Sequence, residues 1–441
     1  MRPIGIDLFA GAGGMSLGFE QAGFDVVAAV EIDPIHCAIH EYNFPNTKVL
    51  CRSVVGLTGA EIRLTAGLGD RSVDVVFGGA PCQGFSMIGQ RAFDDPRNGL
   101  VRDFLRIVRE LDANYFVFEN VKGLTVGRHK AFLEELIAAA GEAGYDVRMK
   151  WQVLDAADYG TPQHRHRLFL LGAKKGLPIP SYPAQSTIPA DKTSKAVADL
   201  PVGPNCNDAL SDIPDADKYK SLLDTDEVEI KTWGELSDYA KEMRCLTNNA
   251  WHFGRVREWN AGSLTSSART IHTEISKGRF AATTPGQVEP ISRFFKLAPG
   301  GLSNTLRAGT DAARGAFTSP RPIHYKYARC VTVREMARLH GYPDWFRFHE
   351  TKWHGARQIG NSVPPPLARA VAGQVLAAMG YEPVAPKGSF RMGDPRLLRM
   401  GMSEASEHFR VAAPIGKRDR KSGAKKRKQH EIEAERLQAI G

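Results

Sequence analysis

Four side chains that could take part in chemistry lie where apolar segments of the chain give way to polar ones. They are a cysteine, a carboxylic acid and two arginines. Cys82 lies in "GGAPCQGFS", Glu119 is in "YFVFEN", and Arg165 and Arg167 alternate in "QHRHR". A thiolate beside a carboxylic acid suits nucleophilic attack on a conjugated ring, because the acid can protonate or hydrogen-bond a ring nitrogen while the sulfur adds. These side chains indicate covalent catalysis if the fold brings them together.

Cys82 could instead be a buried filler, half of a disulfide or a metal ligand. The six cysteines are scattered singly along the chain, so neither a disulfide framework nor a metal knuckle can be read from them. Buried cysteine is common as a small hydrophobe, but a glycine-flanked loop after a strand needs no such filler. The sequence therefore favours a nucleophile and predicts no metal.

The other three side chains also have simpler interpretations. Glu119 could be a helix-start carboxylate before "VKGL". Arg165 and Arg167 could be surface charges on an edge strand. The residues alone leave these alternatives open.

A glycine-rich turn near the N-terminus, "DLFAGAGGMSLGF", indicates a second kind of site. Glycines let the backbone approach a ligand there, and the N-terminus of the following helix favours a polar or anionic group. Ser16 stands where a dinucleotide-binding G-x-G-x-x-G motif would have its third glycine. Glu31, at the end of the next strand, is placed to hold ribose hydroxyls. These features fit a nucleotide or an adenosylmethionine site equally well.

Alternating strands and helices must position these residues. We expect strands at 4–9, 24–33, 48–51, 73–78, 115–120, 146–154 and 167–172. We expect helices at 13–23, 34–43, 99–111, 129–143 and 332–342, and a turn leading into a helix within 358–380. Apolar strands alternating with helices predict an α/β fold with a mostly parallel sheet covered on both faces. Ligands in such sheets bind at the carboxyl ends of the strands, which is where the unusual residues fall.

Composition and charge add two expectations. The segment Lys417 to Lys428 carries a net charge of +7 out of +9 for the whole chain, which is typical of a solvated basic tail or of a non-specific contact to nucleic-acid phosphates. No apolar run approaches the roughly 20 residues of a membrane helix, and the N-terminus carries no signal peptide pattern. We expect a cytoplasmic protein that does not bind membranes.

Together these residues resemble the ordered motifs of the DNA (cytosine-5)-methyltransferases. The matching stretches are "DLFAGAGG", "EID", "GGAPCQGFS", "DPRNGL", "FENVKGL", "GTPQHRHRLFLLG", "VTVREMARLHGYPDWF" and "QIGNSVPPPLARAV". The resemblance implies an adenosylmethionine-dependent, Rossmann-like catalytic domain and a smaller target-recognition domain. We expect a catalytic and cofactor-binding domain at 1–180, a DNA-binding domain at 181–327, a returning segment at 328–385 and a disordered basic tail at 386–441.

The resemblance also implies a role for each catalytic candidate. Cys82 would add to C6 of a cytosine and form a covalent adduct, which activates C5 for methylation. Glu119 would bind N3 and the exocyclic amine. One of Arg165 and Arg167 would hold O2 of the base, and the other the Cys82 loop or a phosphate.

By the same resemblance, S-adenosylmethionine is the cofactor and a set of residues would surround it. The implied contacts are Phe9, Gly11, Gly13, Gly14, Glu31, Ile32, Ser53, Pro81, Leu100, Asn361, Ser362 and Val363. Ser53 departs from the family, which commonly has an aspartate at this position to accept a hydrogen bond from the adenine amine.

The implied partner is double-stranded DNA, from which the target base must be flipped out. The 181–327 region, with Arg255, Arg257, Arg269, Arg279, Arg293 and Arg307, would read the sequence in the major groove. We expect a monomer on DNA and a cognate restriction endonuclease as a functional partner. The alternatives are an RNA (tRNA) cytosine-5 methyltransferase, a nicotinamide-dependent oxidoreductase and a non-catalytic DNA-binding protein. Ser16 and the Cys82 loop disfavour the oxidoreductase, and the intact set of catalytic candidates disfavours the last.

Overall fold

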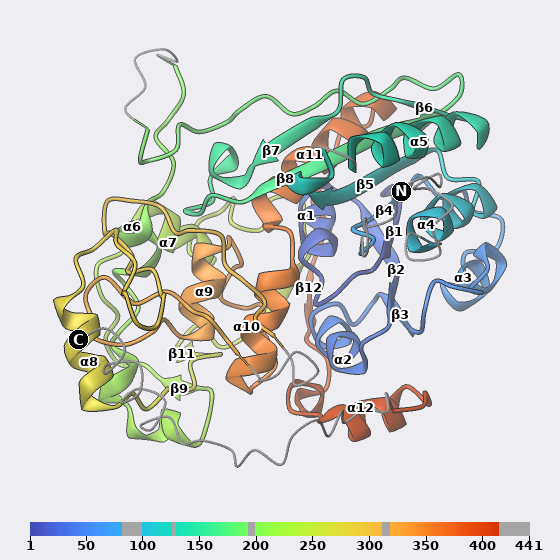
Figure 1. The fold of residues 1–441 in the computed structure, drawn as a ribbon. Coiled ribbons are helices and arrows are strands. Elements are labelled where there is room, and N and C mark those ends of the chain that lie inside the picture. The colour runs from blue at the N-terminus through green and yellow to red at the C-terminus, as the bar shows by residue number, and fades with distance from the viewer. Residues whose placement is uncertain (82–98, 126–128, 193–198, 311–317, 414–441) are drawn as a thin grey trace, which may run out of the picture.

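The computed structural model describes residues 1–81, 99–125, 129–192, 199–310 and 318–413 (Figure 1). A large sheet flanked by helices forms one side of the molecule, and a region of shorter elements forms the other (Figure 1). Within the described residues, no helix is long and apolar enough to cross a membrane.

The sheet has eight strands, and most of its neighbours run parallel. Its order is β3-β2-β1-β4-β5-β8-β6, and β7 also pairs with β8. The parallel strands are β1 (Ile4–Leu8), β2 (Asp25–Glu31), β3 (Lys48–Cys51), β4 (Val75–Gly78) and β5 (Tyr115–Val121). The antiparallel additions are β6 (Tyr145–Val147), β7 (Gln152–Asp155) and β8 (His166–Lys174). The expected α/β class with a mostly parallel sheet is confirmed.

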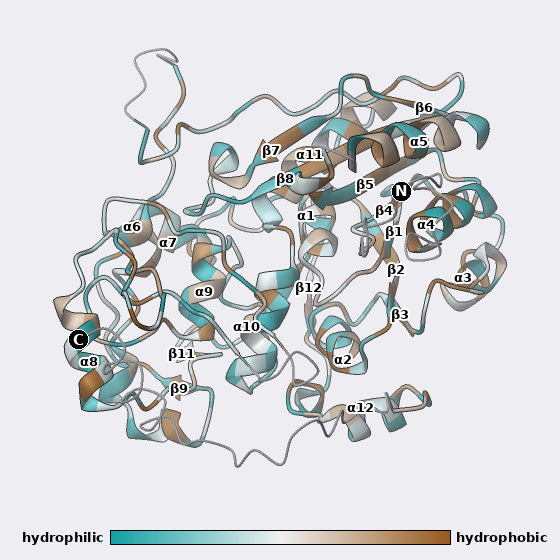
Figure 2. Cartoon of the chain, viewed as in Figure 1, coloured by the Kyte–Doolittle hydropathy of each residue, from teal (hydrophilic) through white to brown (hydrophobic). Residues whose placement is uncertain are grey.

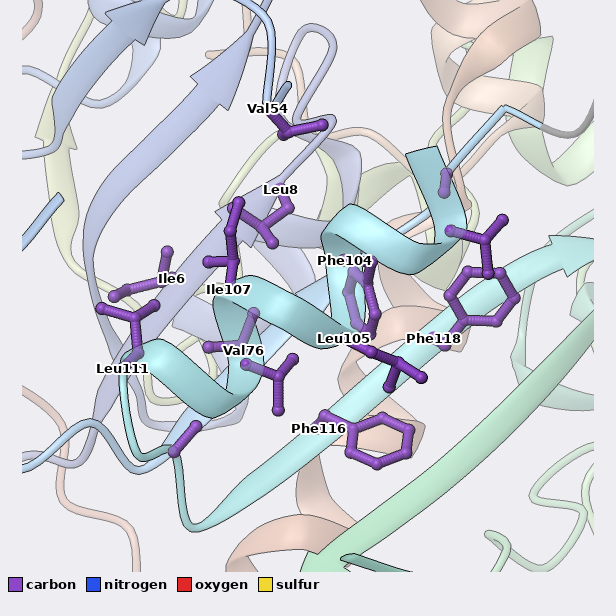
Figure 3. Packing of buried hydrophobic residues seen from close by; sticks show 14 of the residues in the cluster. Ile6, Leu8, Val54, Val76, Phe104, Leu105, Ile107, Leu111, Phe116 and Phe118 are labelled. Atoms are coloured by element: carbon purple, nitrogen blue, oxygen red, sulfur yellow. The ribbon is translucent and has the colours of Figure 1, made fainter. Parts of the chain in front are cut away.

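Helices cover both faces of this sheet because its strands are apolar on both sides. One face packs against α3 (Gly59–Thr65), α4 (Gly99–Glu110) and α5 (His129–Glu142). Figure 3 shows Phe104 and Ile107 of α4 among Leu8, Val76 and Phe118 of the strands. In Figure 2, α4 carries separate hydrophobic and hydrophilic faces, which is typical of a helix that covers a sheet.

The opposite face is covered by two helices from distant parts of the chain, α1 (Gly14–Ala22) and α11 (Pro365–Met379). They pack closely because Gly18 has no side chain: a Cβ there would lie 2.4 Å from Cβ of Ala368. The C-terminal segment therefore returns to the first domain, as its motif requires. The helix α2 (Pro34–Asn43) lies beside β2 and β3 at the end of the sheet.

The second region is built from short elements. They are α6 (Cys206–Leu210), α7 (Asp238–Met243), α8 (Glu274–Ala282), β9 (Val228–Glu229), β10 (Val256–Glu258) and β11 (Ser263–Leu264). Two further helices, α9 (Val333–Leu339) and α10 (Lys352–Asn361), lead from this region back to α11. Their apolar side chains form one cluster with Leu17 and Phe44 of the first domain, so the two regions share a core.

Four local expectations differ from the structure. The helices α3 and α10 were not expected, and the strand expected at 146–154 is two strands, because residues 148–151 leave the sheet between β6 and β7. Residues 386–413 were expected to begin the disordered tail. They instead contain β12 (Ser389–Arg391), a 3₁₀ helix (Pro395–Leu398) and α12 (Met402–His408), because Leu397 and Leu398 are buried against α2. Residues 414–441 lie outside the described part of the chain.

Candidate active site

A cavity of about 630 Å³ opens at the carboxyl ends of the parallel strands. Its walls come from the turns after β1 to β5 and from the end of α10. Fourteen of the residues expected from the sequence line this one cavity: Phe9, Gly11, Gly14, Glu31, Ile32, Ser53, Pro81, Leu100, Glu119, Arg165, Arg167, Asn361, Ser362 and Val363. Cys82 lies outside the described residues, but the preceding Pro81 lines the cavity.

The glycine turn shapes one wall of the cavity. Gly11 has φ +55, and a Cβ there would meet nothing within 4 Å, so its backbone faces open space. Gly14 has the opposite surroundings, because a Cβ would lie 2.6 Å from both the Tyr342 hydroxyl and the Val363 carbonyl. Gly14 therefore allows the returning segment to close against the turn. Phe9 also has a positive φ of 63, a conformation that is rare for a non-glycine residue and recurs at ligand sites.

Gly13 does not line the cavity. A Cβ at Gly13 would lie 2.4 Å from the Phe44 ring and 3.1 Å from the His40 ring. It has φ +102 and precedes the first residue of α1. Gly13 thus packs closely against Phe44 and His40, and the cofactor contact that the resemblance implies for it stays a prediction.

A buried polar network beneath the turn was not expected from the sequence. The Ser16 hydroxyl donates to Asp7 Oδ2 at 2.6 Å and lies 3.0 Å from His40 Nε2. Burial raises the pKa of Asp7 to about 8 and lowers that of His40 to about 3. Ser16 thus replaces the third glycine of a dinucleotide motif with a hydrogen-bond donor. The signal for this network was Asp7 itself, a charged residue inside the apolar strand "IGIDLF".

Glu31 is oriented by backbone amides. Its Oε2 accepts from Gly11 N, and its Oε1 accepts from Ile32 N and Asp33 N, all at 2.9 Å. A carboxylate has about four acceptor positions, so it keeps capacity for a hydroxyl in the cavity. Ile32 is 65% exposed although it is apolar, which suits a flat apolar ligand group. The Ser53 hydroxyl accepts from Val55 N at 3.1 Å.

Glu119 and Arg167 form an ion pair in the cavity wall. Arg167 Nε lies 2.8 Å from Glu119 Oε1, and both side chains are largely buried. Gly79 makes room for the carboxylate, because a Cβ there would lie 2.3 Å from Glu119 Oε2. Burial raises the pKa of Glu119, and Arg167 and Arg165 partly offset this effect. Next to it, Asn120 Nδ2 donates to the Ala80 carbonyl at 2.9 Å and ties β5 to the turn that leads to Cys82.

Arg165 is placed differently from Arg167. The strand β8 begins at His166, so Arg167 lies within it and Arg165 precedes it. Its guanidinium is fully buried and donates to the Leu306 carbonyl at 3.0 Å and the Gly360 carbonyl at 2.7 Å. Its Nε has no hydrogen-bond partner among the described residues. Burial and the neighbouring Arg167 lower the pKa of Arg165 to about 9. Neither arginine is a surface charge on an edge strand.

Gln163 and His340 join segments that carry residues of the cavity wall, and they were not identified from the sequence. Gln163 Oε1 accepts from Leu306 N at 3.0 Å, and its Nε2 lies 2.9 Å from His340 Nδ1. His340 Nε2 in turn lies 3.1 Å from the Ser362 hydroxyl. Burial keeps the pKa of His340 well below its usual value, so the ring is neutral. Three segments that are distant in the sequence thus meet through hydrogen bonds between uncharged groups. No local sequence motif predicts these hydrogen bonds.

Most of the arginines expected to read DNA have partners inside the protein. Arg255 pairs with Asp25, Arg257 with Glu20, Arg269 with Asp217 and Arg279 with Glu289. These four stabilise the second region and its junction with α1. Arg307 is exposed and directly follows Leu306, the residue whose carbonyl holds Arg165.

Several known proteins are similar to this chain over most of its length. The family model of the C-5 cytosine-specific DNA methylases matches residues 4–377. The chain is 56% identical to the Type II methyltransferase M.XorII of Xanthomonas oryzae pv. oryzae over 94% of both chains. It is 33% identical to M1.HphI of Haemophilus parahaemolyticus over 84% of this chain and 86% of that protein. A solved structure described as a prophage-encoded DNA modification methyltransferase of E. coli superposes with a TM-score of 0.65 at 31% identity, covering 86% of this chain and 99% of that one.

Proposed function

The chain belongs to the C-5 cytosine-specific DNA methylase family, and from this premise we propose that it methylates C5 of a flipped-out cytosine at a specific site in double-stranded DNA. The observation that carries this proposal is the Glu119–Arg167 pair, which lines the same cavity as the glycine turn, Glu31 and Pro81. One space thus holds groups suited to a cofactor and groups suited to a pyrimidine.

The residues at the other end of the cavity fit S-adenosylmethionine. Glu31 retains acceptor capacity for the ribose hydroxyls, and Phe9, Ile32 and Leu100 offer apolar surface to the adenine. Ser53 can accept from the adenine amine, although it also accepts from Val55 N. Gly11 leaves open space beside the backbone, and Asn361, Ser362 and Val363 close the wall. When bound, the cofactor supplies an electrophilic methyl group that becomes attached to C5.

The base-binding end explains how the ring is activated. N3 and O2 are neighbours on the pyrimidine ring, and Glu119 and Arg167 are neighbours in the wall. We therefore assign N3 and the exocyclic amine to Glu119, and O2 to Arg167. Because burial raises the pKa of Glu119, the acid can give its proton to N3 as negative charge develops on the ring. Arg165 supports the wall through the carbonyls of Leu306 and Gly360.

Cys82 is the proposed nucleophile. Its thiolate forms a bond to C6, and the electron pair of the C5–C6 double bond moves so that C5 becomes nucleophilic. After C5 carries the methyl group, N3 returns its proton to the Glu119 carboxylate and a base takes up the C5 proton. The electron pair released at C5 re-forms the C5–C6 double bond as the sulfur–C6 bond breaks. The thiolate is thereby regenerated and no metal takes part.

The DNA geometry follows from this chemistry. C5 and C6 of a stacked cytosine cannot be reached inside a duplex, so the base must leave the stack, at a cost of a few kcal/mol. We propose that the 181–327 region reads the sequence and that exposed Arg307 contacts a phosphate beside the flipped base. We further propose that the protein acts as a monomer on DNA in a prokaryotic cytoplasm. There the modification would protect DNA from a cognate restriction endonuclease.

A methyl-transfer assay tests this function. The protein is incubated with S-adenosylmethionine labelled in its methyl group and with either duplex DNA or tRNA. We expect label in 5-methylcytosine of DNA and none in tRNA. Label in tRNA alone would replace this proposal with the RNA methyltransferase alternative.

A further inference from the structure

A segment beyond the family's own domain packs behind the cofactor end of the cavity. The family model ends at residue 377, whereas ordered elements continue to α12 (Met402–His408). We call residues 387–411 the C-terminal brace. Figure 1 shows its last helix, α12, lying against α2.

The brace shares one apolar cluster with the glycine turn and α2. Leu397 and Leu398 of its 3₁₀ helix are each 2% exposed. They form one apolar cluster with Ala12 of the turn and with Ala38, Ile39 and Tyr42 of α2. Ala12 also lines the cavity. Ala12 therefore lines the cavity and also belongs to the apolar cluster that contains the brace leucines.

The brace also holds the segment that leads into α10. The Leu398 carbonyl accepts from Glu350 N at 3.0 Å, and the Met400 carbonyl lies 3.2 Å from His349 Nε2. His349 N donates to Gln358 Oε1 at 3.0 Å, and Gln358 lines the cavity. A second chain of contacts thus runs from the brace to the opposite wall.

A third contact fixes the start of the brace. The strand β12 pairs in parallel with β10 of the second region, and the Phe390 ring lies 4.7 Å from the guanidinium carbon of Arg257. Arg257 forms a buried ion pair with Glu20 of α1 and lies 4.3 Å from the Trp345 ring. The brace is therefore anchored on both regions before it reaches the turn.

We propose that the C-terminal brace positions the glycine turn and the Gln358 wall for cofactor binding, so that loosening the brace weakens binding of S-adenosylmethionine without weakening DNA binding. The assignment of this cavity to S-adenosylmethionine rests on the proposed function. The observations that carry it are the apolar cluster that Ala12 shares with Leu397 and Leu398, and the approach of His349 Nε2 to the Met400 carbonyl. These residues act through the turn and the wall, so they are positioning residues.

The test uses the full chain with both brace leucines shortened, L397A/L398A. Because the leucines back Ala12, we expect the Kd for S-adenosylmethionine, measured by calorimetry, to rise about tenfold. Hydrogen exchange at residues 10–14 should also be faster in the cofactor-free protein. The Kd for duplex DNA should stay within about twofold of wild type. Phe409→Ala shortens a half-buried side chain packed on the same cluster. We expect it to raise the cofactor Kd by less than L397A/L398A does, and it is the test variant if the double variant does not fold.

A matched control separates positioning from general loss of stability. Leu133 and Leu136 of α5 are also buried, but they belong to the cluster between the sheet and the helices α3, α4 and α5, and neither is among the residues that line the cavity. L133A/L136A should lower the melting temperature comparably and leave the cofactor Kd and the exchange at 10–14 unchanged. A wild-type cofactor Kd in folded L397A/L398A, or equal weakening in both double variants, would overturn the proposal. If wild type binds no S-adenosylmethionine, the proposed function fails, while the exchange comparison still decides whether the brace orders the turn.

Discussion

Arg167 Nε lies 2.8 Å from Glu119 Oε1, while the neighbouring Arg165 turns its guanidinium to main-chain carbonyls. The two arginines, which are separated by one residue, therefore have different partners: Arg167 pairs with an acid, and Arg165 donates to the main chain. Glu119 and Arg167 come from the paired strands β5 and β8, with Val121 opposite Arg167 in the register. This pairing places the acid and the arginine side by side on the cavity wall.

The different placements predict different losses on substitution. Arg165→Lys removes a planar fork that bonds two carbonyls, so it should destabilise the protein by about 2 kcal/mol, because buried acceptors lose their donors. Arg167→Lys keeps a charge beside Glu119 and should change stability little while lowering kcat at least about tenfold through poorer support of the base. Thermal unfolding and methyl-transfer kinetics of the two variants check this. Equal effects of both substitutions on melting temperature and on kcat would contradict the assignment.

Asp7 predicts a pH dependence of stability. Its pKa is raised from 3.8 to about 8 in the folded protein, so between these values the folded state binds a proton that the unfolded state has lost. Stability is therefore fully present below the unfolded pKa and falls as pH rises towards 8. Asp7→Asn keeps an acceptor for Ser16 and removes this titration.

Urea unfolding between pH 6.5 and 8 measures the effect. Wild type should lose unfolding free energy more steeply than Asp7→Asn, by up to about 1.4 kcal/mol per pH unit. His40 stays neutral in the fold because its pKa is about 3, so its titration in the unfolded state contributes equally to both proteins and cancels in the comparison. Parallel pH profiles for the two proteins would show that Asp7 does not titrate there.

Gly14→Ala should separate the returning segment from the glycine turn. The added Cβ would lie 2.6 Å from the Val363 carbonyl and the Tyr342 hydroxyl, so the backbone at 362–363 must shift and the cofactor Kd should rise about tenfold or more. Gly141→Ala is the control, because a Cβ within α5 meets nothing within 4 Å and should stabilise by about 0.5–1 kcal/mol. Calorimetry on both variants decides the matter. A normal cofactor Kd in Gly14→Ala would show that the closure of the segment is unimportant.

Removing residues 417–441 should weaken non-specific DNA binding. This deletion removes Lys417 to Lys428, with a net charge of +7, together with residues 429–441, with a net charge of −2. Fewer phosphate counterions are then released, and the slope of log K against log salt becomes shallower. The methylated sequence should not change. Filter binding at several salt concentrations and sequencing of the methylated sites check both parts, and a changed methylation pattern would refute the separation of tail and recognition.

Much of the sheet could be predicted because its strands are short apolar runs that end in glycine or polar residues. β1, β2 and β5 lie within a residue or two of their expected positions, and the carboxyl-end rule brought Glu31, Pro81 and Glu119 to one cavity. These are local signals with a simple spatial rule behind them. The roles of the individual residues stay predictions.

The features that could not be predicted depend on contacts between segments that are distant in the sequence. The local sequence patterns of α10 and the brace did not predict their helices. The brace is ordered because Leu397 and Leu398 are buried in one apolar cluster with Ala12 and residues of α2. Gln163 and His340 meet only when three segments converge. Gly13 lies in the expected motif, but a Cβ there would meet the rings of Phe44 and His40. The spacing of residues in the sequence does not reveal this packing.

The most direct test of the whole account is bisulfite sequencing of DNA from cells that lack cytosine methylation and express either the wild-type chain or Cys82→Ser. Calorimetry on the purified variant controls for the cofactor site, where S-adenosylmethionine binding should be largely intact. We expect 5-methylcytosine at one recurring DNA sequence with wild type and none with Cys82→Ser. Methylation by Cys82→Ser at the wild-type level, or no methylation by the wild-type chain, would contradict it.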